Sequence, residues 1–447
     1  MAAIARSLSP PHGARGAAIA IVACVAVCGA AVLVPQQPLL ALAVAGGLLV
    51  AALLVQGNRL LLVAAVPAVW LGEIVRLAGG ALSISDAFLI VAALSALLSL
   101  DLSRRAVRNA VFVIASYQAV QLLAVVHALT AYAAQEWAHR LLLVTGGVLI
   151  GAALVRRGVL RPALQLFVAG GVVIAVLGVA VTFASALTPA YPLQQKNYEG
   201  DLLASALLIV LFVPRDVWTL RTRWRVVLLA VLGAGLLSTQ SRGAMFALAF
   251  GLVVYALFSR RFDGRSFLLV LVTLTGLAFF ATSFGGDLQV QLQQQYGSLF
   301  DRQLYAREAV QAWQTSPWLG AGIRFWETGL YALNSDPHDL ILYTLGESGV
   351  IGLASLLVLL VGTGVVVFRS RSALAVLAVA LLATRFAHGL VDVYWVHGSL
   401  AIPWVIAGAA LALPRRATDT SATDAPPPAA RRSAELAAMR LGSAARP

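Results

Sequence analysis

The sequence predicts an all-α, polytopic integral membrane protein with about 12–14 transmembrane helices. Hydrophobic residues make up 60% of the chain and charged residues only 11%, and the mean hydropathy is +0.88. Apolar stretches of about 20 residues, the length that crosses a bilayer as a helix, recur along the chain. Arginine clusters fall in alternate connections between these stretches, as the positive-inside rule requires. A water-soluble globule is therefore excluded.

The predicted spans follow one another with short connections. They occupy 16–34, 38–55, 59–77, 86–100, 107–126, 140–155, 161–186, 199–213, 226–240, 244–258, 266–284, 340–368, 373–396 and 399–413. Several are short enough to be half-helices or tilted segments. Glycines inside these apolar spans favour close packing between helices.

The arginine clusters orient the chain. With both termini in the cytoplasm, the following all face inward: Arg104, Arg105 and Arg108; Arg156, Arg157 and Arg161; Arg215, Arg221, Arg223 and Arg225; Arg260, Arg261 and Arg265; Arg369 and Arg371. The net charge of +13 is thereby explained without a nucleic-acid partner. Eight basic residues have no such topological role: Arg76, Arg140, Lys196, Arg242, Arg302, Arg307, Arg324 and Arg385.

Three regions are expected along the chain: a cytoplasmic N-terminus at 1–15, a transmembrane domain at 16–413 and a disordered cytoplasmic tail at 414–447. The longest polar connection, 285–337, is predicted to be extracytoplasmic and to contain short helices, including an amphipathic one from Asp301 to Trp313. A Walker-type phosphate loop is absent from the sequence, which weighs against an ATP-driven transporter.

The most informative motif ends the long loop. Pro337, His338 and Asp339 precede a membrane helix, with Gly349 and Gly352 following within it. A histidine at the mouth of such a helix is suited to general-base chemistry near neutral pH. The alternative is a loop histidine that makes only a local cap.

Cations at the predicted outer ends of helices are the next candidates. Arg242, in Ser241-Arg242-Gly243, and Arg302 offer planar guanidinium groups that suit phosphate oxygens. A structural ion pair is the competing interpretation for Arg242, and Arg307 could simply pair with a carboxylate. Lys196, the only lysine of the chain, is followed by Asn197 and could contact phosphate or sugar, or be a solvated surface charge.

A third candidate lies inside a predicted span. Arg385, His388 and Asp392 are spaced three and four residues apart, so they share one helix face. Ionisable residues within a membrane span face a cavity or one another. A substrate-lining role and a self-satisfied polar stripe are both compatible with this spacing.

These motifs together resemble the superfamily of O-antigen ligases, O-antigen polymerases and related bacterial membrane glycan transferases. The resemblance covers about 190–365 and rests on four segments: Gln195-Lys196-Asn197-Tyr198-Glu199-Gly200, Thr239-Gln240-Ser241-Arg242-Gly243-Ala244, Asp301-Arg302 through Pro317-Trp318-Leu319-Gly320-Ala321-Gly322, and His338 through Gly352. The sequence departs from the ligase pattern at Asp339, which either raises the basicity of His338 or caps the helix, and at Ala306.

The resemblance implies a metal-independent glycosyltransferase that inverts the anomeric centre and needs no cofactor. The donor would be a polyprenyl-diphosphate-linked glycan and the acceptor a hydroxyl of a glycan, lipid or protein, at the outer face of the bacterial cytoplasmic membrane. Arg242 and Arg302 would hold the diphosphate, and His338 would take the acceptor proton. Lys196, Asn197, Arg307, Asp339, Arg385 and His388 would contact substrate.

Alternatives remain open at this point. A polymerase joins one lipid-linked repeat to another, whereas a ligase transfers the finished glycan, and the motifs do not separate the two. A flippase or secondary transporter for an anionic lipid-linked glycan would instead distribute cations through the depth of several spans. A non-catalytic membrane scaffold leaves the outer arginines unexplained.

Overall fold

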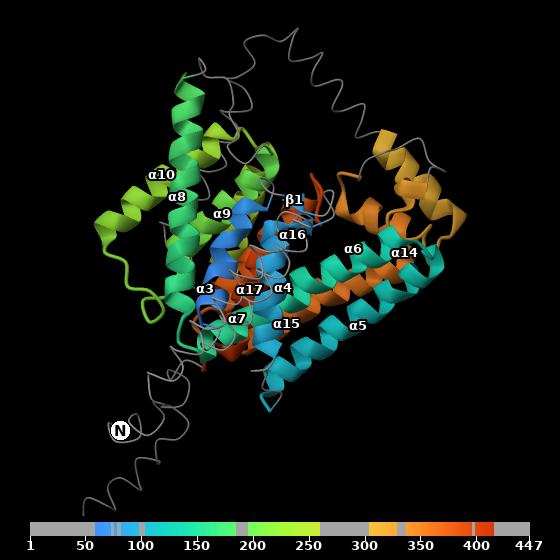
Figure 1. Ribbon diagram of the computed structural model, residues 1–447, viewed down its shortest axis with the longest axis horizontal. Helices are drawn as coiled ribbons and strands as arrows, with labels where there is room; N and C mark the ends of the chain where they lie inside the picture. The colour runs from blue at the N-terminus through green and yellow to red at the C-terminus, as the bar shows by residue number, and fades with distance from the viewer. Residues whose placement is uncertain are drawn as a thin grey trace, which may run out of the picture.

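The computed structural model describes residues 59–72, 76–77, 82–97, 103–184, 195–259, 304–328, 337–395 and 398–414. The predictions for the N-terminus at 1–15, the tail beyond Pro414 and the candidate residue Arg302 lie outside these residues. Figure 1 shows the described part as a body of packed helices.

Helices dominate the described chain, and the predicted all-α class is confirmed. Their bounds are α3 (Arg59–Ala68), η2 (Val69–Leu71), α4 (Ile84–Leu97), α5 (Arg105–Ala128), α6 (Ala131–Leu141), η4 (Leu142–Gly146), α7 (Gly147–Arg156), α8 (Leu160–Ala184), α9 (Lys196–Phe212), α10 (Thr222–Ser238), α11 (Arg242–Ser259), η5 (Phe325–Thr328), α14 (Leu340–Leu357), η6 (Val358–Gly362), α15 (Thr363–Arg369), α16 (Ala375–Gly389) and α17 (Ala401–Ala412). A further helix covers 304–315. Two short strands, β1 (Arg76–Leu77) and β2 (Leu82–Ser83), pair antiparallel, with Arg76 opposite Ser83.

Five helical stretches of the described chain are long and apolar enough to cross a membrane. They are Arg105–Ala128, Ala131–Arg156, Leu160–Ala184, Arg242–Ser259 and Leu340–Arg369. Two of them run through π-helical turns, η4 and η6, without ending there. The chain is therefore a multi-pass membrane protein, while the expected total of 12–14 spans includes segments outside the described residues and stays a prediction.

Glycines allow the helices of the bundle to pack closely, as their positions within apolar spans predict. The closest such contact joins α7 and α17. A methyl group at Gly151 would lie 1.8 Å from the Val405 carbonyl oxygen, and one at Gly408 would lie 2.0 Å from that of Val148. The backbones of the two helices therefore meet directly at these two positions.

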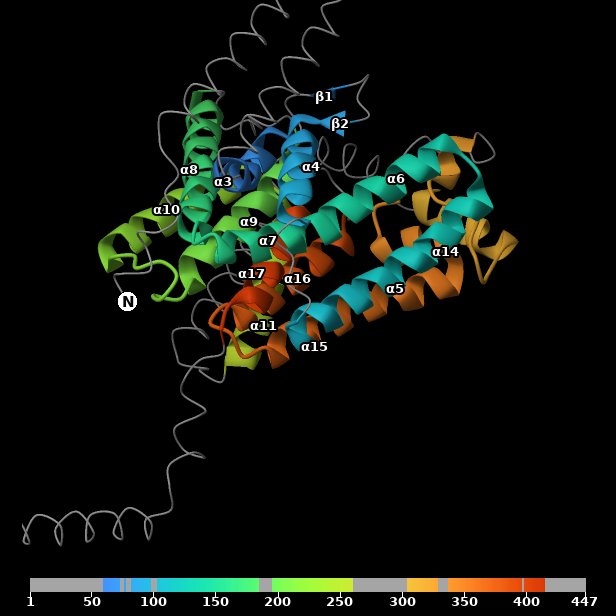
Figure 2. The same cartoon turned by 60° about the horizontal axis from the view of Figure 1, so that its bottom comes forward.

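The helices form two connected parts. One part groups α3, α4 and α7–α11 with α16 and α17; α11 packs on α16, and α8 on α10. In the other part, α5, α6 and α14 run side by side away from the group, toward the segment 304–328 (Figure 2). The Arg104 guanidinium donates a hydrogen bond to the Ala412 carbonyl, so the beginning of α5 meets the end of α17, as the alternation of spans requires.

Candidate active site

His338 lies immediately before α14, and neighbours on both sides place it. Its ring stacks on Tyr305 of the helix 304–315, with centroids 5.5 Å apart and planes 11° from parallel. The next residue, Asp339, accepts hydrogen bonds from the Ile341 and Leu342 amides at 2.9 and 3.0 Å and so caps α14. The His338 side chain is 27% exposed, which leaves one part of the imidazole accessible from outside.

A carboxylate faces this histidine from a different helix. Asp392 follows the end of α16, and its Oδ1 lies 3.8 Å from His338 Nε2. Its other oxygen, Oδ2, lies 3.9 Å from His388 Nε2. Both distances exceed a direct hydrogen bond but suit electrostatic orientation or a bridging water. Asp392 therefore links the accessible histidine to the interior of the bundle.

Arg385 anchors the inner end of this arrangement. It is 1% exposed, and its Nη1 lies 3.0 Å from Asp201 Oδ2 of α9 and 3.1 Å from His388 Nδ1. Its Nη2 donates to the carbonyls of Val393, at 3.1 Å, and Tyr394. The Arg385 guanidinium also lies over the Tyr394 ring, with Cζ 5.2 Å from the ring centroid.

The contact with Arg385 selects the tautomer of His388. Guanidinium can only donate, so His388 Nδ1 must accept, and the ring proton sits on Nε2. That nitrogen points toward Asp392. The residues His338, Asp392, His388, Arg385 and Asp201 thus form a continuous series of polar contacts, called here the His338–Arg385 chain. All of its members except His338 are buried, so Arg385 and His388 are not open to a substrate.

The predicted cationic motifs meet at the same end of the bundle. Ser241 Oγ donates to Asn197 Oδ1 at 2.9 Å and also accepts from the Ala244 amide at 3.3 Å, which caps α11. Gly200 permits the approach, because a methyl group there would lie 2.7 Å from Ala244 Cβ. One at Gly243 would lie 3.5 Å from His388 Nε2, so the motif borders the His338–Arg385 chain.

Three of the predicted cations lie on accessible positions. Lys196 and Arg242 are exposed at the first residues of α9 and α11, and helix N-termini favour anions. Arg307 is also exposed, two residues beyond the Tyr305 ring that stacks on His338. The structure thus brings Asn197 and Arg242 to the border of the histidine site.

The glycine motifs have a structural explanation. The segment Pro317–Gly322 lies along α14 and accepts or donates backbone hydrogen bonds there, including Val350 N to the Pro317 carbonyl at 2.9 Å and Ala321 N to the Gly346 carbonyl at 2.8 Å. Gly349 has φ +63°, and a methyl group there would lie 2.4 Å from the Trp318 carbonyl. Gly349 and the backbone hydrogen bonds therefore hold the segment Pro317–Gly322 against α14, the helix that follows His338.

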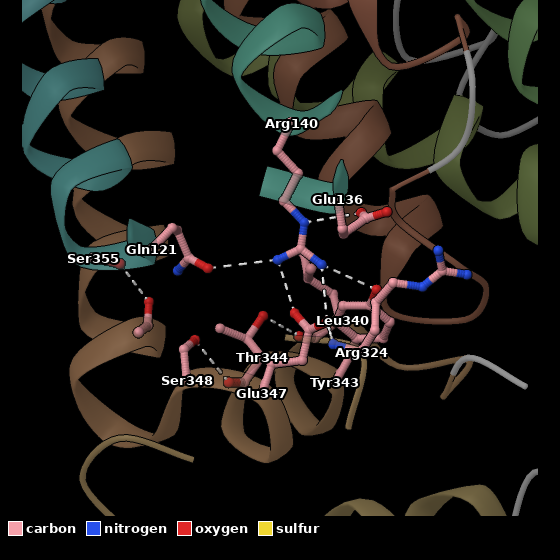
Figure 3. A network of polar contacts seen from close by, with 11 residues as sticks. Gln121, Glu136, Arg140, Arg324, Leu340, Tyr343, Thr344, Glu347, Ser348 and Ser355 are labelled. Atoms are coloured by element: carbon pink, nitrogen blue, oxygen red, sulfur yellow. Dashed lines mark hydrogen bonds and ion pairs between the residues drawn. The ribbon is translucent and has the colours of Figure 1, made fainter. Parts of the chain in front are cut away.

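A second polar network surrounds Arg140 of α6 (Figure 3). Its guanidinium contacts Glu136 at 3.0 Å, Glu347 at 2.8 Å, the Tyr343 hydroxyl at 3.1 Å and Gln121 at 3.5 Å. Trp395 covers it at 4.7 Å from the ring centroid. Glu347 Oε1 also accepts from the Arg324 amide at 3.0 Å. We call these residues the Arg140 network; it joins α5, α6 and α14 to Arg324 in the segment 304–328.

Sequence reasoning identified part of this geometry. It singled out His338, Arg242, Arg385 and Arg140 as cations or bases needing a partner. It missed the contribution of Tyr305, which carries no sequence signal, and of Asp201. The sequence predicted only that Asp392 shares a helix face with Arg385 and His388, whereas in the structure its carboxylate faces His338 and His388.

The fold and the site define a multi-pass membrane protein with a histidine, a carboxylate and arginines gathered at one end of its helices. Residues 226–357 match a family model described as O-antigen ligase. This range begins within α10 and includes α11 and α14, the helix that follows His338. The expected resemblance to the O-antigen ligase and polymerase superfamily is therefore confirmed over 226–357, while the segment Gln195–Gly200 lies outside the match. The match supports a ligase- or polymerase-type role in membrane glycan processing. No curated protein matches the chain.

Proposed function

We propose that the protein transfers a glycan from a polyprenyl-diphosphate carrier to an acceptor hydroxyl. The main support is one juxtaposition: His338, with a carboxylate 3.8 Å away, shares an end of the bundle with Arg242 at the N-terminus of α11. A base and an anion-binding group are what such a transfer needs. The family match over 226–357 supports the same class of reaction.

His338 acts as the general base in this proposal. It takes the proton of the acceptor hydroxyl while the acceptor oxygen attacks the anomeric carbon from the face opposite the diphosphate. The bond between that carbon and the diphosphate oxygen breaks, its electron pair leaves with the diphosphate, and the anomeric centre inverts. Arg242, together with Arg302, holds the diphosphate and stabilises the charge that develops on the leaving oxygen. The proton on His338 then passes to solvent or to the released diphosphate.

Buried members of the His338–Arg385 chain position the base. Asp392 stabilises the imidazolium that forms when His338 Nε2 takes the acceptor proton, because the other ring nitrogen, Nδ1, is buried. His388 and Arg385 hold Asp392 from behind, and Asp201 balances the guanidinium charge. We therefore assign Arg385 and His388 a positioning role in place of the substrate contact that their spacing suggested.

The exposed polar groups around the base complete the proposed substrate site. Lys196 and Asn197 contact phosphate or sugar at the N-terminus of α9, and Arg307 extends the cationic surface beside Tyr305. Asp339 serves as the cap of α14 and thereby fixes the residue before it. Following the positive-inside rule, the site lies on the outer face of the bacterial cytoplasmic membrane.

Glycan transfer in a purified system tests this function. The full chain, in detergent or liposomes, is incubated without nucleotide with a lipid-diphosphate-linked oligosaccharide and candidate acceptors. Wild type is compared with His338→Ala and Arg242→Ala. Matched controls are His127→Ala, an exposed histidine at the end of α5, and Arg221→Ala, an exposed arginine at the opposite end of the neighbouring helix α10.

Product formation by wild type and both controls, with loss in His338→Ala and Arg242→Ala, is expected. The product itself separates the two subclasses: a longer lipid-linked glycan means polymerase, and glycan on another acceptor means ligase. If transfer persists in His338→Ala, the assigned base is wrong. If no variant or wild type forms product but labelled lipid-linked glycan crosses the liposome bilayer, the transporter alternative is correct.

A further inference from the structure

The turn between α10 and α11 holds Ser241 in a fixed place. Gln240, the residue before it, has φ +51°, a left-handed conformation that residues other than glycine adopt at a cost. Thr239 fixes the turn from the other side: its Oγ1 donates to the Leu236 carbonyl at 2.7 Å and accepts from the Ser241 amide at 3.2 Å. Strained turns that neighbouring contacts hold in this way are concentrated at functional sites.

The contacts of the Ser241 hydroxyl decide where its one proton goes. The Ala244 N–H points at Oγ from 3.3 Å, so the oxygen acts as an acceptor there. Asn197 Oδ1, from α9, lies 2.9 Å from the same oxygen. An amide oxygen can only accept, so the hydroxyl proton goes to Asn197. Ser241 is fully buried, and water therefore does not compete for this proton.

This hydrogen bond sets the orientation of the Asn197 amide. With Oδ1 turned toward Ser241, the amide nitrogen Nδ2 is turned away from it and carries two protons. Asn197 is half-buried, and Nδ2 contacts no acceptor among the described residues. The amide nitrogen, and not the amide oxygen, is therefore left for a ligand.

The groups beside this hydrogen bond share one property, which is that they only donate. Lys196 precedes Asn197, Arg242 follows Ser241, and both side chains are exposed. An ammonium, a guanidinium and an amide nitrogen offer protons and no lone pair. A sugar hydroxyl would leave its own proton without an acceptor in such surroundings, whereas every oxygen of a phosphate accepts. The donor-only set therefore favours a phosphate group over a sugar.

We propose that Ser241 is a positioning residue, which holds the Asn197 amide so that Nδ2 donates to a phosphate oxygen of the donor's diphosphate. The identity of that anion rests on the proposed function. Ser241 itself does not touch the substrate and acts through Asn197. An amide that is already oriented loses little rotational freedom when the diphosphate binds, so the orientation strengthens binding.

Equilibrium binding to the purified full-length protein in detergent tests this inference without requiring transfer. The probes are farnesyl diphosphate and, as the uncharged comparison, farnesol. Asn197→Ala should weaken binding of the diphosphate about 10- to 100-fold, the range for loss of a hydrogen bond to a charged group, and leave farnesol binding unchanged. Asn197→Asp should bind the diphosphate more weakly still, because a carboxylate then faces it.

A double-mutant cycle separates positioning from folding. Ser241→Ala lets the amide rotate and should weaken diphosphate binding about 3- to 10-fold. In the Asn197→Ala background no amide remains to be oriented, so Ser241→Ala should have no further effect. A purely structural role, such as the cap of α11, would give the same loss in both backgrounds. The matched control is Ser238→Ala, whose hydroxyl bonds only to the Gly235 carbonyl of its own helix and which should bind like wild type.

Three results would overturn the inference. They are equal effects of Ser241→Ala in the two backgrounds, wild-type binding of the diphosphate by Asn197→Asp, which would mean that the amide presents its oxygen, and equal affinity of wild type for farnesyl diphosphate and farnesol. The proposed reaction fails separately. If the binding pattern is as expected but wild type forms no glycan product, the role of Ser241 stands and transfer falls. If His338→Ala abolishes transfer while Asn197→Ala binds the diphosphate like wild type, transfer stands and the role of Ser241 falls.

Discussion

The Arg140 network and the His338–Arg385 chain both place an arginine inside the membrane helices, but they end differently. Arg140 has two carboxylates, Glu136 and Glu347, within 3.0 Å, and its network reaches the partly exposed Arg324 through the backbone amide of that residue. Arg385 has one carboxylate, Asp201, at that distance, and its contacts continue through His388 and Asp392 to a histidine that is 27% exposed. A buried arginine is therefore no sign of a substrate site by itself. What distinguishes the two is the group at the exposed end: His338 can accept a proton, whereas the Arg324 amide and guanidinium can only donate.

Removing the exposed end of the His338–Arg385 chain should have the largest effect on activity. His338→Ala is expected to lower the transfer rate about 10²- to 10⁴-fold, the range for loss of a general base. Its thermal stability should stay near wild type, because the side chain is partly exposed. The rate is measured as glycan transfer per folded molecule, with His127→Ala as control. A large stability loss with little change in rate would make His338 a structural residue and remove the contrast with Arg140.

Breaking the Arg140 network should give the opposite result. Arg140→Ala leaves Glu136 and Glu347 without their cation, and such a change costs about 3–5 kcal/mol of stability. The measurement is thermal unfolding in detergent. Restoring neutrality in the triple variant Arg140→Met, Glu136→Gln, Glu347→Gln should recover part of the loss, since no buried charge stays unpaired.

Activity per folded molecule is the discriminating readout for this network. Arg140→Ala protein that remains folded is expected to transfer glycan at a rate close to wild type. A transfer rate that falls as far as in His338→Ala, in protein with wild-type stability, would place Arg140 in the catalytic machinery and contradict its structural role.

Substitution of Asp392 tests whether its carboxylate couples His338 to the buried residues His388 and Arg385. Asp392→Asn should lower kcat, by less than His338→Ala, and leave KM for the lipid-linked donor unchanged, because this side chain positions the base rather than contacting the donor. Asp392→Glu should recover part of kcat by restoring the carboxylate. A rise in KM with constant kcat would instead identify Asp392 as a substrate contact.

The smallest effect is expected at Asp339, beside the catalytic histidine. Asp339→Ala removes the cap of α14 and should cost about 0.5–2 kcal/mol, measured by thermal unfolding. Asp339→Asn retains a capping oxygen and should keep both stability and transfer rate. A strong loss of rate in Asp339→Asn would show that its charge, rather than its cap, supports His338.

The sequence alone determined the class of fold, because hydropathy and helix length act locally and need no knowledge of neighbours. The alternation of arginine clusters also predicted that the polar motifs gather at one end of the spans, and Asn197, Arg242 and His338 all lie at helix starts. The motif glycines were recognisable, although their purpose, close backbone contact between the loop segment and α14, was not.

Only the tertiary structure decided which charges meet. Helical spacing predicted that Arg385, His388 and Asp392 share one helix face, whereas α16 ends at Gly389 and Asp392 lies beyond it. The spacing also could not show that Asp201, 184 residues away, neutralises the arginine. It also could not separate Arg385 from Arg140, whose carboxylate partner Glu347 lies 207 residues away. In a low-dielectric interior the role of an ionisable group depends on the few ångströms to its partner. Periodicity within one helix does not specify that distance across the bundle.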